Sequence, residues 1–333
     1  MASFENIDYR LRPAKAIERK MIAEVIRKLS IFHKIEDYRY IGFGSIYFSD
    51  FTLFHKGLGI KNMISIEHET EYEERVKFNL PYSFIEVYHN TSSIILPDLK
   101  WDVPSIIWLD YDFPISSIML DDIATICANA IEGSLLMVTV NVNPFKISNE
   151  ASKISNFRLK ELKVRIGDNK IPLGIEEKHL SQKGFSKVVR QILVNEIQEN
   201  LKNRSLLTKN VEQKYTFQQL MNFKYEDGAT MLTLGGVILK NNQKDLLDKS
   251  NFQDLDFLSF DDQEYRIDVP KLTLREVNHL DAKVHEQIIS DEDGNIKFNP
   301  KFSKKYSKFL KLDDILKYYK IYRYYPNFTE SIL

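Results

Sequence analysis

The chain has 333 residues, 43% of them hydrophobic and 28% charged, a composition typical of a globular protein with one large domain or two. Its formal net charge of −1 excludes a global attraction to nucleic acid or to an anionic membrane, so any basic surface must be local. No apolar run reaches the ~18 residues of a membrane span and the N-terminus carries no signal-peptide pattern, so we expect a cytoplasmic protein without a membrane partner.

The N-terminal segment, residues 1–36, contains a predicted helix over residues 13–29. Pro13 suits its first turn. Apolar residues recur along one face at helical spacing: Ile17, Met21, Val25 and Leu29. The other face carries four cations: Arg12, Lys15, Arg19 and Lys20. We interpret this basic face as solvated rather than as a phosphate-binding surface, since a helix with four basic residues is ordinary.

Residues 37–145 alternate between strand-like and helix-like patterns. Strands are predicted at 38–42, 63–67, 83–88, 104–111 and 134–141, and helices at 48–57, 69–78 and 116–131. This alternation predicts an α/β core with a parallel sheet that is covered on both faces. The single cysteine, Cys127, lies in the apolar pattern of the last of these helices and is predicted to be buried rather than nucleophilic.

A glycine-containing turn follows the first predicted strand. It reads Gly42-Phe43-Gly44-Ser45, and the second strand ends at Glu67. The separation of Gly44 and Glu67, 67 − 44 = 23 positions, is close to the ~20 expected of such units. In a βαβ unit the glycines let the backbone approach a ligand closely, while the acid accepts hydrogen bonds from ribose hydroxyls. Although a third glycine is missing, the spacing predicts that residues 37–145 form a cofactor-binding, Rossmann-like core.

Three further segments follow the core. Residues 146–212 predict a helical insertion with a basic stretch at 153–190, which we interpret as an amphipathic cap in preference to a substrate-facing lid. Residues 213–240 predict a closing β-hairpin, because two strand-like runs flank Glu226-Asp227-Gly228. Residues 241–333 predict a C-terminal α+β or helical module with a lysine- and tyrosine-rich tail.

The basic stretches suggest two kinds of macromolecular partner. Nucleic acid could bind through residues 153–190 and 301–325, and a protein partner through the C-terminal module. For the tail we prefer packing against the body of the protein, because its apolar residues recur at helical spacing.

Together these residues resemble a class I S-adenosylmethionine-dependent methyltransferase and, within that class, a bacterial O-methyltransferase-like group. The resemblance covers residues 13–240 and depends on three runs: Tyr40-Ile41-Gly42-Phe43-Gly44-Ser45, Ile64-Ser65-Ile66-Glu67 and Ile107-Trp108-Leu109-Asp110-Tyr111-Asp112. It implies a seven-stranded, mostly parallel doubly wound sheet with a terminal antiparallel hairpin. One departure from the family pattern is the absence of the acid that commonly begins the first motif.

The resemblance also implies where the cofactor binds. Gly42 and Gly44 border the methionine part of S-adenosylmethionine, Glu67 holds the ribose, and Asp110 lies near the transferred methyl group. The complete implied set is Gly42, Phe43, Gly44, Ser45, Glu67, His68, Asn90, Thr91, Ser92 and Asp110.

Catalytic candidates lie where the fourth and fifth strands end, because ligands bind beyond the carboxyl ends of strands in open α/β sheets. We expect Asp110, Asp112 and His89 to serve as bases or to act electrostatically. Asp110, Asp112 and Asn141 resemble the Mg²⁺ site of catechol-type O-methyltransferases. With only two carboxylates, we favour a site without metal.

The sequence therefore predicts a methyltransferase that acts on a hydroxyl or carboxylate and leaves the acceptor unidentified. One alternative is a non-catalytic or partner-dependent subunit of a bacterial system for modification or antiviral defence. A weaker alternative is a nicotinamide-dependent oxidoreductase, which shares the glycine turn and the ribose acid. Methylation of nucleic-acid bases is disfavoured, because Asp110-Tyr111-Asp112-Phe113-Pro114 stands where those enzymes carry Asp/Asn-Pro-Pro-aromatic.

Overall fold

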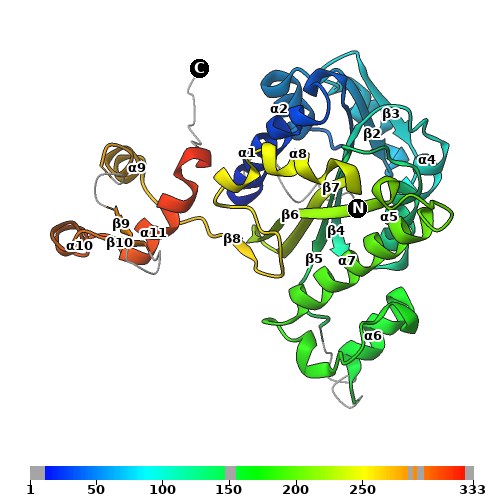
Figure 1. Cartoon of the computed structure of the whole chain (residues 1–333). Coiled ribbons are helices and arrows are strands. Elements are labelled where there is room, and N and C mark those ends of the chain that lie inside the picture. Colours follow the sequence, from blue (N-terminus) through cyan, green and yellow to red (C-terminus); the bar gives the residue numbers. More distant parts are fainter. Residues whose placement is uncertain (1–11, 147–154, 284–287, 291–295, 327–333) are drawn as a thin grey trace.

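An eight-stranded sheet forms the centre of the computed structural model, which describes residues 12–146, 155–283, 288–290 and 296–326. Its strand order is β3-β2-β1-β4-β5-β7-β6-β8 (Figure 1). The strands are β1 (Arg39–Phe43), β2 (Asn62–Glu67), β3 (Ile85–His89), β4 (Ser105–Pro114), β5 (Leu135–Asn141), β6 (Tyr215–Glu226), β7 (Thr230–Lys240) and β8 (Tyr265–Ile267). Strands β1 to β5 pair in parallel, and β7 pairs antiparallel with both β5 and β6.

Helices cover both faces of this sheet. They are α1 (Pro13–Lys28), α2 (Ser49–Leu58), α3 (Glu73–Phe78), α4 (Ser92–Asp98), α5 (Ser117–Asn129), α6 (Phe157–Ile166), α7 (Phe185–Arg204) and α8 (Lys244–Lys249). Successive side chains of a strand point to opposite faces, so Trp108 of β4 joins the hydrophobic core under α1 and α2, while Ile107 and Leu109 join the core under α5 and α7. The predicted mostly parallel, doubly wound α/β fold with its closing hairpin is confirmed.

The sheet has eight strands rather than the seven that the resemblance implies. The additional strand, β8, pairs in parallel with β6, with Phe223 opposite Tyr265. The rings of Phe223 and Phe257 lie 6.0 Å apart, and those of Phe223 and Tyr265 lie 6.1 Å apart. Because β8 is only three residues long, it carries too few positions for a strand pattern, and packing on β6 determines its place.

The hairpin between β6 and β7 holds the start of α1. Arg12 supplies no side-chain cap to this helix. Instead, the backbone N–H groups of Ala14 and Lys15 donate to Asp227 of the hairpin turn, at 3.3 and 2.9 Å. Since these first-turn N–H groups have no partner within a helix, Asp227 acts as a cap from a distant part of the chain. This contact fixes α1 over the end of the sheet.

The C-terminal part forms a small separate cluster beside β8 in Figure 1. It contains α9 (Leu274–Asp281), α10 (Pro300–Tyr306), α11 (Leu312–Ile321) and an antiparallel pair, β9 (Ile288–Ser290) with β10 (Ile296–Phe298). Its core includes the tail residues Tyr306 and Tyr318. Tyr324 donates a 2.6 Å hydrogen bond to Glu24 of α1. The helices described in the structure include none with the length and apolar character needed to span a membrane.

Candidate functional site

A cavity of about 500 Å³ lies at the carboxyl ends of β1, β2, β3 and β4. The strand order reverses between β1 and β4, which is where open α/β sheets bind ligands. The volume of the cavity is within the ~300–1,000 Å³ that is typical of small-molecule sites. The lining residues are Arg19, Phe43, Gly44, Ser45, Asp50, Ile66, Glu67, His68, Glu69, Tyr72, Val76, Asn90, Thr91, Ser92, Ser93, Asp110, Tyr111, Asp112, Phe113 and Ile118.

Glu67 and Gly44 lie side by side in the wall of this cavity. The Glu67 side chain is buried, and Ser65 Oγ donates a 2.8 Å hydrogen bond to Glu67 Oε1. A Cβ atom on Gly44 would lie 2.1 Å from both Glu67 Oε1 and Ser65 Oγ, closer than any real contact. Burial raises the pKa of Glu67 to about 7, while the hydrogen bond from Ser65 opposes the rise. Because of the short Cβ distances, the turn needs glycine at position 44 so that the backbone of the turn can pass over the Glu67 carboxylate.

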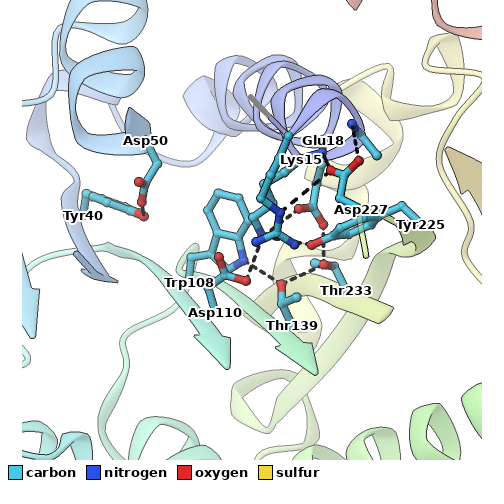
Figure 2. A network of polar contacts seen from close by, with 12 residues as sticks. Lys15, Glu18, Tyr40, Asp50, Trp108, Asp110, Thr139, Tyr225, Asp227 and Thr233 are labelled. Carbon is cyan, nitrogen blue, oxygen red and sulfur yellow. Dashed lines mark hydrogen bonds and ion pairs between the residues drawn. The ribbon is translucent and has the colours of Figure 1, made fainter. Parts of the chain in front are cut away.

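Gly42 has a different role from Gly44 and does not line the cavity. A Cβ atom there would lie 2.4 Å from the phenol oxygen of Tyr40, so the missing side chain makes room for this ring. The Tyr40 hydroxyl donates to the carboxylate of Asp50 on α2 (Figure 2). Burial raises the pKa of Asp50, and the charge of Arg19 opposes that rise. Asp50 was not among the predicted site residues.

Another wall is formed by the β3–α4 connection and by aromatic residues of β4. Asn90, Thr91 and Ser92 line it, as the resemblance implied. Ser92 donates to the buried Asp122 of α5, and Tyr111 donates to the same Oδ2 atom at 2.5 Å. Burial raises the pKa of Asp122. Asp122 therefore connects the two elements that form this wall.

The structure does not bring His89 to this cavity. It lies at the end of β3, opposite Glu67 in the sheet register. Both of its ring nitrogens are buried without a hydrogen-bond partner in the described residues. His68, by contrast, is exposed and lines the cavity. Of the predicted cofactor-binding and catalytic residues, Gly42 and His89 lie outside the lining. For His89 the reason is that sequence position at a strand end does not fix the direction of a side chain.

Lys15 is buried at the α1 side of the cavity, so the expectation of a fully solvated basic face was wrong. Its side chain has no exposed surface, and Nζ lies 2.7 Å from Asp110 Oδ1 and 2.8 Å from Glu18 Oε2 (Figure 2). Nζ also donates to the Tyr225 hydroxyl at 3.1 Å and lies 4.3 Å from the centre of the Trp108 ring. The hairpin brings Tyr225 over this face, which the helical pattern alone could not indicate.

Polar contacts continue from Lys15 into the sheet. Thr233 donates to Glu18, Thr139 and Thr233 lie 2.7 Å apart, and Trp108 Nε1 donates to Thr139 at 2.9 Å. Burial raises the pKa of Tyr225 well above its ordinary value. These contacts join α1 to β4, β5, β6 and β7. They hold Asp110, which is one quarter exposed, in a fixed position at the cavity.

The predicted metal ligands show other contacts. Asp110 Oδ1 is bound by Lys15, and the Asn141 side-chain oxygen accepts a 2.9 Å hydrogen bond from the backbone of Asn143. Among the described residues, no group of three or more His, Cys, Asp or Glu is arranged to hold a metal ion. Cys127 is buried as predicted, and burial raises its pKa to about 12. Magnesium binding at Asp110, Asp112 and Asn141, which the sequence analysis disfavours, stays untested.

Comparison with known proteins gives one match over nearly the whole chain. Residues 7–333 match the sequence profile of a family described as "Putative O-methyltransferase". No curated protein matches the chain.

Three of the solved structures that match the chain are as follows. Trm1 from Pyrococcus horikoshii, in complex with S-adenosyl-L-methionine, is 9% identical with a TM-score of 0.40, and the match covers 71% of this chain and 57% of that one. SAM-bound CalS10, an amino pentose methyltransferase from Micromonospora echinaspora, is 12% identical with a TM-score of 0.27, covering 37% and 49%. LepI in complex with SAM is 11% identical with a TM-score of 0.30, covering 61% and 43%. The chain spans less than two thirds of the length of each.

Proposed function

Because the chain belongs to the family described as "Putative O-methyltransferase", we propose that it transfers a methyl group from S-adenosylmethionine to an oxygen atom of an acceptor. The family match confirms the methyltransferase resemblance of the sequence. The observation that supports the proposed cofactor best is the placement of Glu67. Its buried carboxylate ends β2, lies against Gly44 and lines a cavity at the switch point of the sheet.

The residues of the cavity fit an adenosyl group. The Glu67 carboxylate is an acceptor for two ribose hydroxyls, and no side chain at Gly44 blocks the space above it. Phe43, Phe113 and Ile118 offer apolar surface to a purine ring, and Asn90 offers an amide. When bound, the cofactor supplies an activated methyl group on a positively charged sulfur.

The residues of β4 supply the remaining chemistry of the proposed reaction. Methyl transfer needs alignment of the nucleophile and, for a hydroxyl acceptor, removal of a proton. Asp110 presents a carboxylate that Lys15 fixes in position, and this negative charge stabilises a cationic sulfur. Asp112 lies exposed at the rim of the cavity, where it accepts the proton of an incoming hydroxyl.

Calorimetric titration with S-adenosylmethionine and S-adenosylhomocysteine tests the cofactor. We expect binding to the wild-type protein, a loss of at least tenfold in affinity in Glu67→Ala, and no loss in Glu71→Gln. Glu71 is the matched control, since it is exposed four residues later and lies outside the cavity lining. Absence of heat and of thermal stabilisation with both compounds would refute the assignment.

Transfer of labelled methyl groups to fractionated cell extract tests the reaction. Small molecules, RNA and protein are separated after incubation, and the labelled fraction is then treated with mild alkali. A methyl ester formed on a carboxylate releases the label under these conditions, whereas a methyl ether formed on a hydroxyl retains it. Label found only on nitrogen or carbon atoms contradicts transfer to oxygen.

A partner-dependent subunit of a modification or defence system is the second function that we keep, because five exposed lysines support a contact surface. They are Lys301, Lys304, Lys305, Lys308 and Lys311. A protein would bind through the C-terminal module, and nucleic acid through residues 153–190 and 301–325. Label transfer by the purified chain alone argues against this function, and transfer that requires a co-purified component supports it.

A further inference from the structure

Arg19 of α1 is a buried cation that forms no hydrogen bond or ion pair with the described residues. Its side chain is only 8% exposed and lines the cavity. Its Nε atom has no hydrogen-bond partner, and the described residues offer the guanidinium no hydrogen bond or ion pair. Lys15, one helical turn earlier, has three such partners. The two cations on the same face of α1 therefore differ: one is saturated by the protein and the other is not.

An unpaired buried charge indicates a ligand. Burying a guanidinium without a partner is costly, and folded proteins normally pair such groups or bind ligands with them. A guanidinium has five N–H donors in a planar arrangement that matches a carboxylate. Since the unpaired side of Arg19 is the cavity, the partner it lacks is an anionic group of a molecule that binds there.

The surroundings of Arg19 narrow the choice of ligand. The charge of Arg19 lowers the pKa of Asp50, whereas the charge of Asp110 raises it. Both acids line the cavity beside it. A simple anion at Arg19 would be repelled by these two carboxylates, and a simple cation would be repelled by Arg19. A group that carries both charges side by side gives each protein charge its own partner.

We propose that Arg19 and Asp50 bind an α-amino acid group, with Arg19 on its carboxylate and Asp50 on its ammonium. This inference rests on the proposed function for one of two sources, the methionyl end of the cofactor. The second source is an acceptor that is itself an amino acid. In either case the charges that bind the amino acid group come from α1 and α2. They do not come from the first strand, which lacks an acid at the usual position.

Binding of two adenosine ligands shows whether the amino acid group belongs to the cofactor or to an acceptor. S-adenosylhomocysteine carries the amino acid group, whereas 5′-methylthioadenosine has the same nucleoside and thioether without it. If the cofactor is the source, Arg19→Gln loses at least tenfold in affinity for the first ligand in calorimetric titration and keeps its affinity for the second. Arg27→Gln is the matched control, because Arg27 is exposed on the same helix and outside the cavity.

If an acceptor is the source, Arg19→Gln binds both adenosine ligands like the wild type. Free amino acids then raise the melting temperature of the wild-type protein and fail to raise that of the variant. The proposal is overturned if the variant matches the wild type with both adenosine ligands and with every amino acid. Should the wild type bind neither adenosine ligand, the cofactor assignment fails, while the amino acid measurement still tests Arg19.

A second variant guards against misfolding of Arg19→Gln. Arg19→Lys keeps the charge and loses the planar pair of donors, so we expect a smaller loss in the same measurement. Near-ultraviolet circular dichroism like that of the wild type establishes folding for both variants. The recognition site is ruled out if both variants, Arg19→Lys and Arg19→Gln, keep the wild-type ratio of affinities for the two adenosine ligands and also respond to amino acids like the wild type.

Discussion

The ammonium of Lys15 and the carboxylate of Asp110 lie 2.7 Å apart, joining helix α1 to the central strand β4. Lys15 has no exposed surface and also contacts Glu18 at 2.8 Å. A single buried cation thus pairs with acids from two elements. Because Asp110 lines the cavity, the stability of the fold and the shape of the site depend on the same side chain.

Lys15→Met should destabilise the protein by roughly 3–5 kcal/mol, since it leaves buried carboxylates without their cation. Urea denaturation measures the change. The double variant Lys15→Met with Glu18→Gln should recover part of the loss, because one of the uncompensated charges is removed. Equal stabilities of the wild type and Lys15→Met would show that the ion pair does not stabilise the fold.

Glu67 should make the ligand-free protein less stable as pH rises. Its pKa is about 7 in the folded state and 4.5 ordinarily. Between those values the folded state holds a proton that the unfolded state has lost, so the free energy of unfolding falls with pH, on the order of 2–3 kcal/mol in total. Urea denaturation from pH 4.5 to 8 should show this decline, and Glu67→Gln should remove most of it. A decline of the same size in the variant assigns it to other groups.

Affinity for S-adenosylhomocysteine should increase as pH rises, whereas the stability of the ligand-free protein falls. The ionised carboxylate of Glu67 accepts hydrogen bonds from both ribose hydroxyls, whereas the protonated form has one acceptor fewer. Because the pKa lies near 7, calorimetric affinity should increase between pH 6 and 8, by about tenfold or less. An affinity independent of pH across this range would place the ribose away from Glu67.

Gly44→Ala should abolish cofactor binding. The added Cβ atom would lie 2.1 Å from Glu67 Oε1 and Ser65 Oγ and must displace the carboxylate. Gly57→Ala provides the comparison, because its Cβ atom would meet nothing closer than 3.8 Å, inside helix α2. This second variant should keep its affinity and gain up to about 1 kcal/mol in stability. Normal calorimetric binding by Gly44→Ala would mean that the turn does not contact the cofactor.

Asp227→Ala should loosen α1 by removing the acceptor of two first-turn N–H groups. Loss of a cap typically costs about 1–2 kcal/mol. Hydrogen exchange of the amides of Ala14 and Lys15 should accelerate, and urea denaturation should give the stability change. Asp227→Asn, which keeps one acceptor oxygen, should show a smaller effect. Unchanged exchange in Asp227→Ala would indicate that other contacts fix the helix.

The parallel half of the sheet could be predicted from the sequence because its elements repeat a local pattern. The apolar runs of β4 and β5 indicated doubly buried strands, and both lie in the middle of the sheet. Two short elements, β8 and α4, were not predicted, since three and seven residues show no reliable period. The cavity residues Arg19 and Asp50 were not predicted either. Arg19 comes from α1, which the distant Asp227 holds in place, and no motif in the sequence singled out Asp50.

The sequence by itself determined the glycine turn at Gly44, the acid at Glu67 and their separation, because a single βαβ unit fixes all three through local geometry. Only the tertiary structure decided the charges around them. Lys15 and Arg19 become buried because the hairpin turn at Asp227 holds α1 against the sheet, a contact more than two hundred residues apart in the chain. Burial then makes one cation a structural partner of Asp110, and it leaves the other in the cavity wall without an ion pair among the residues that the structure describes.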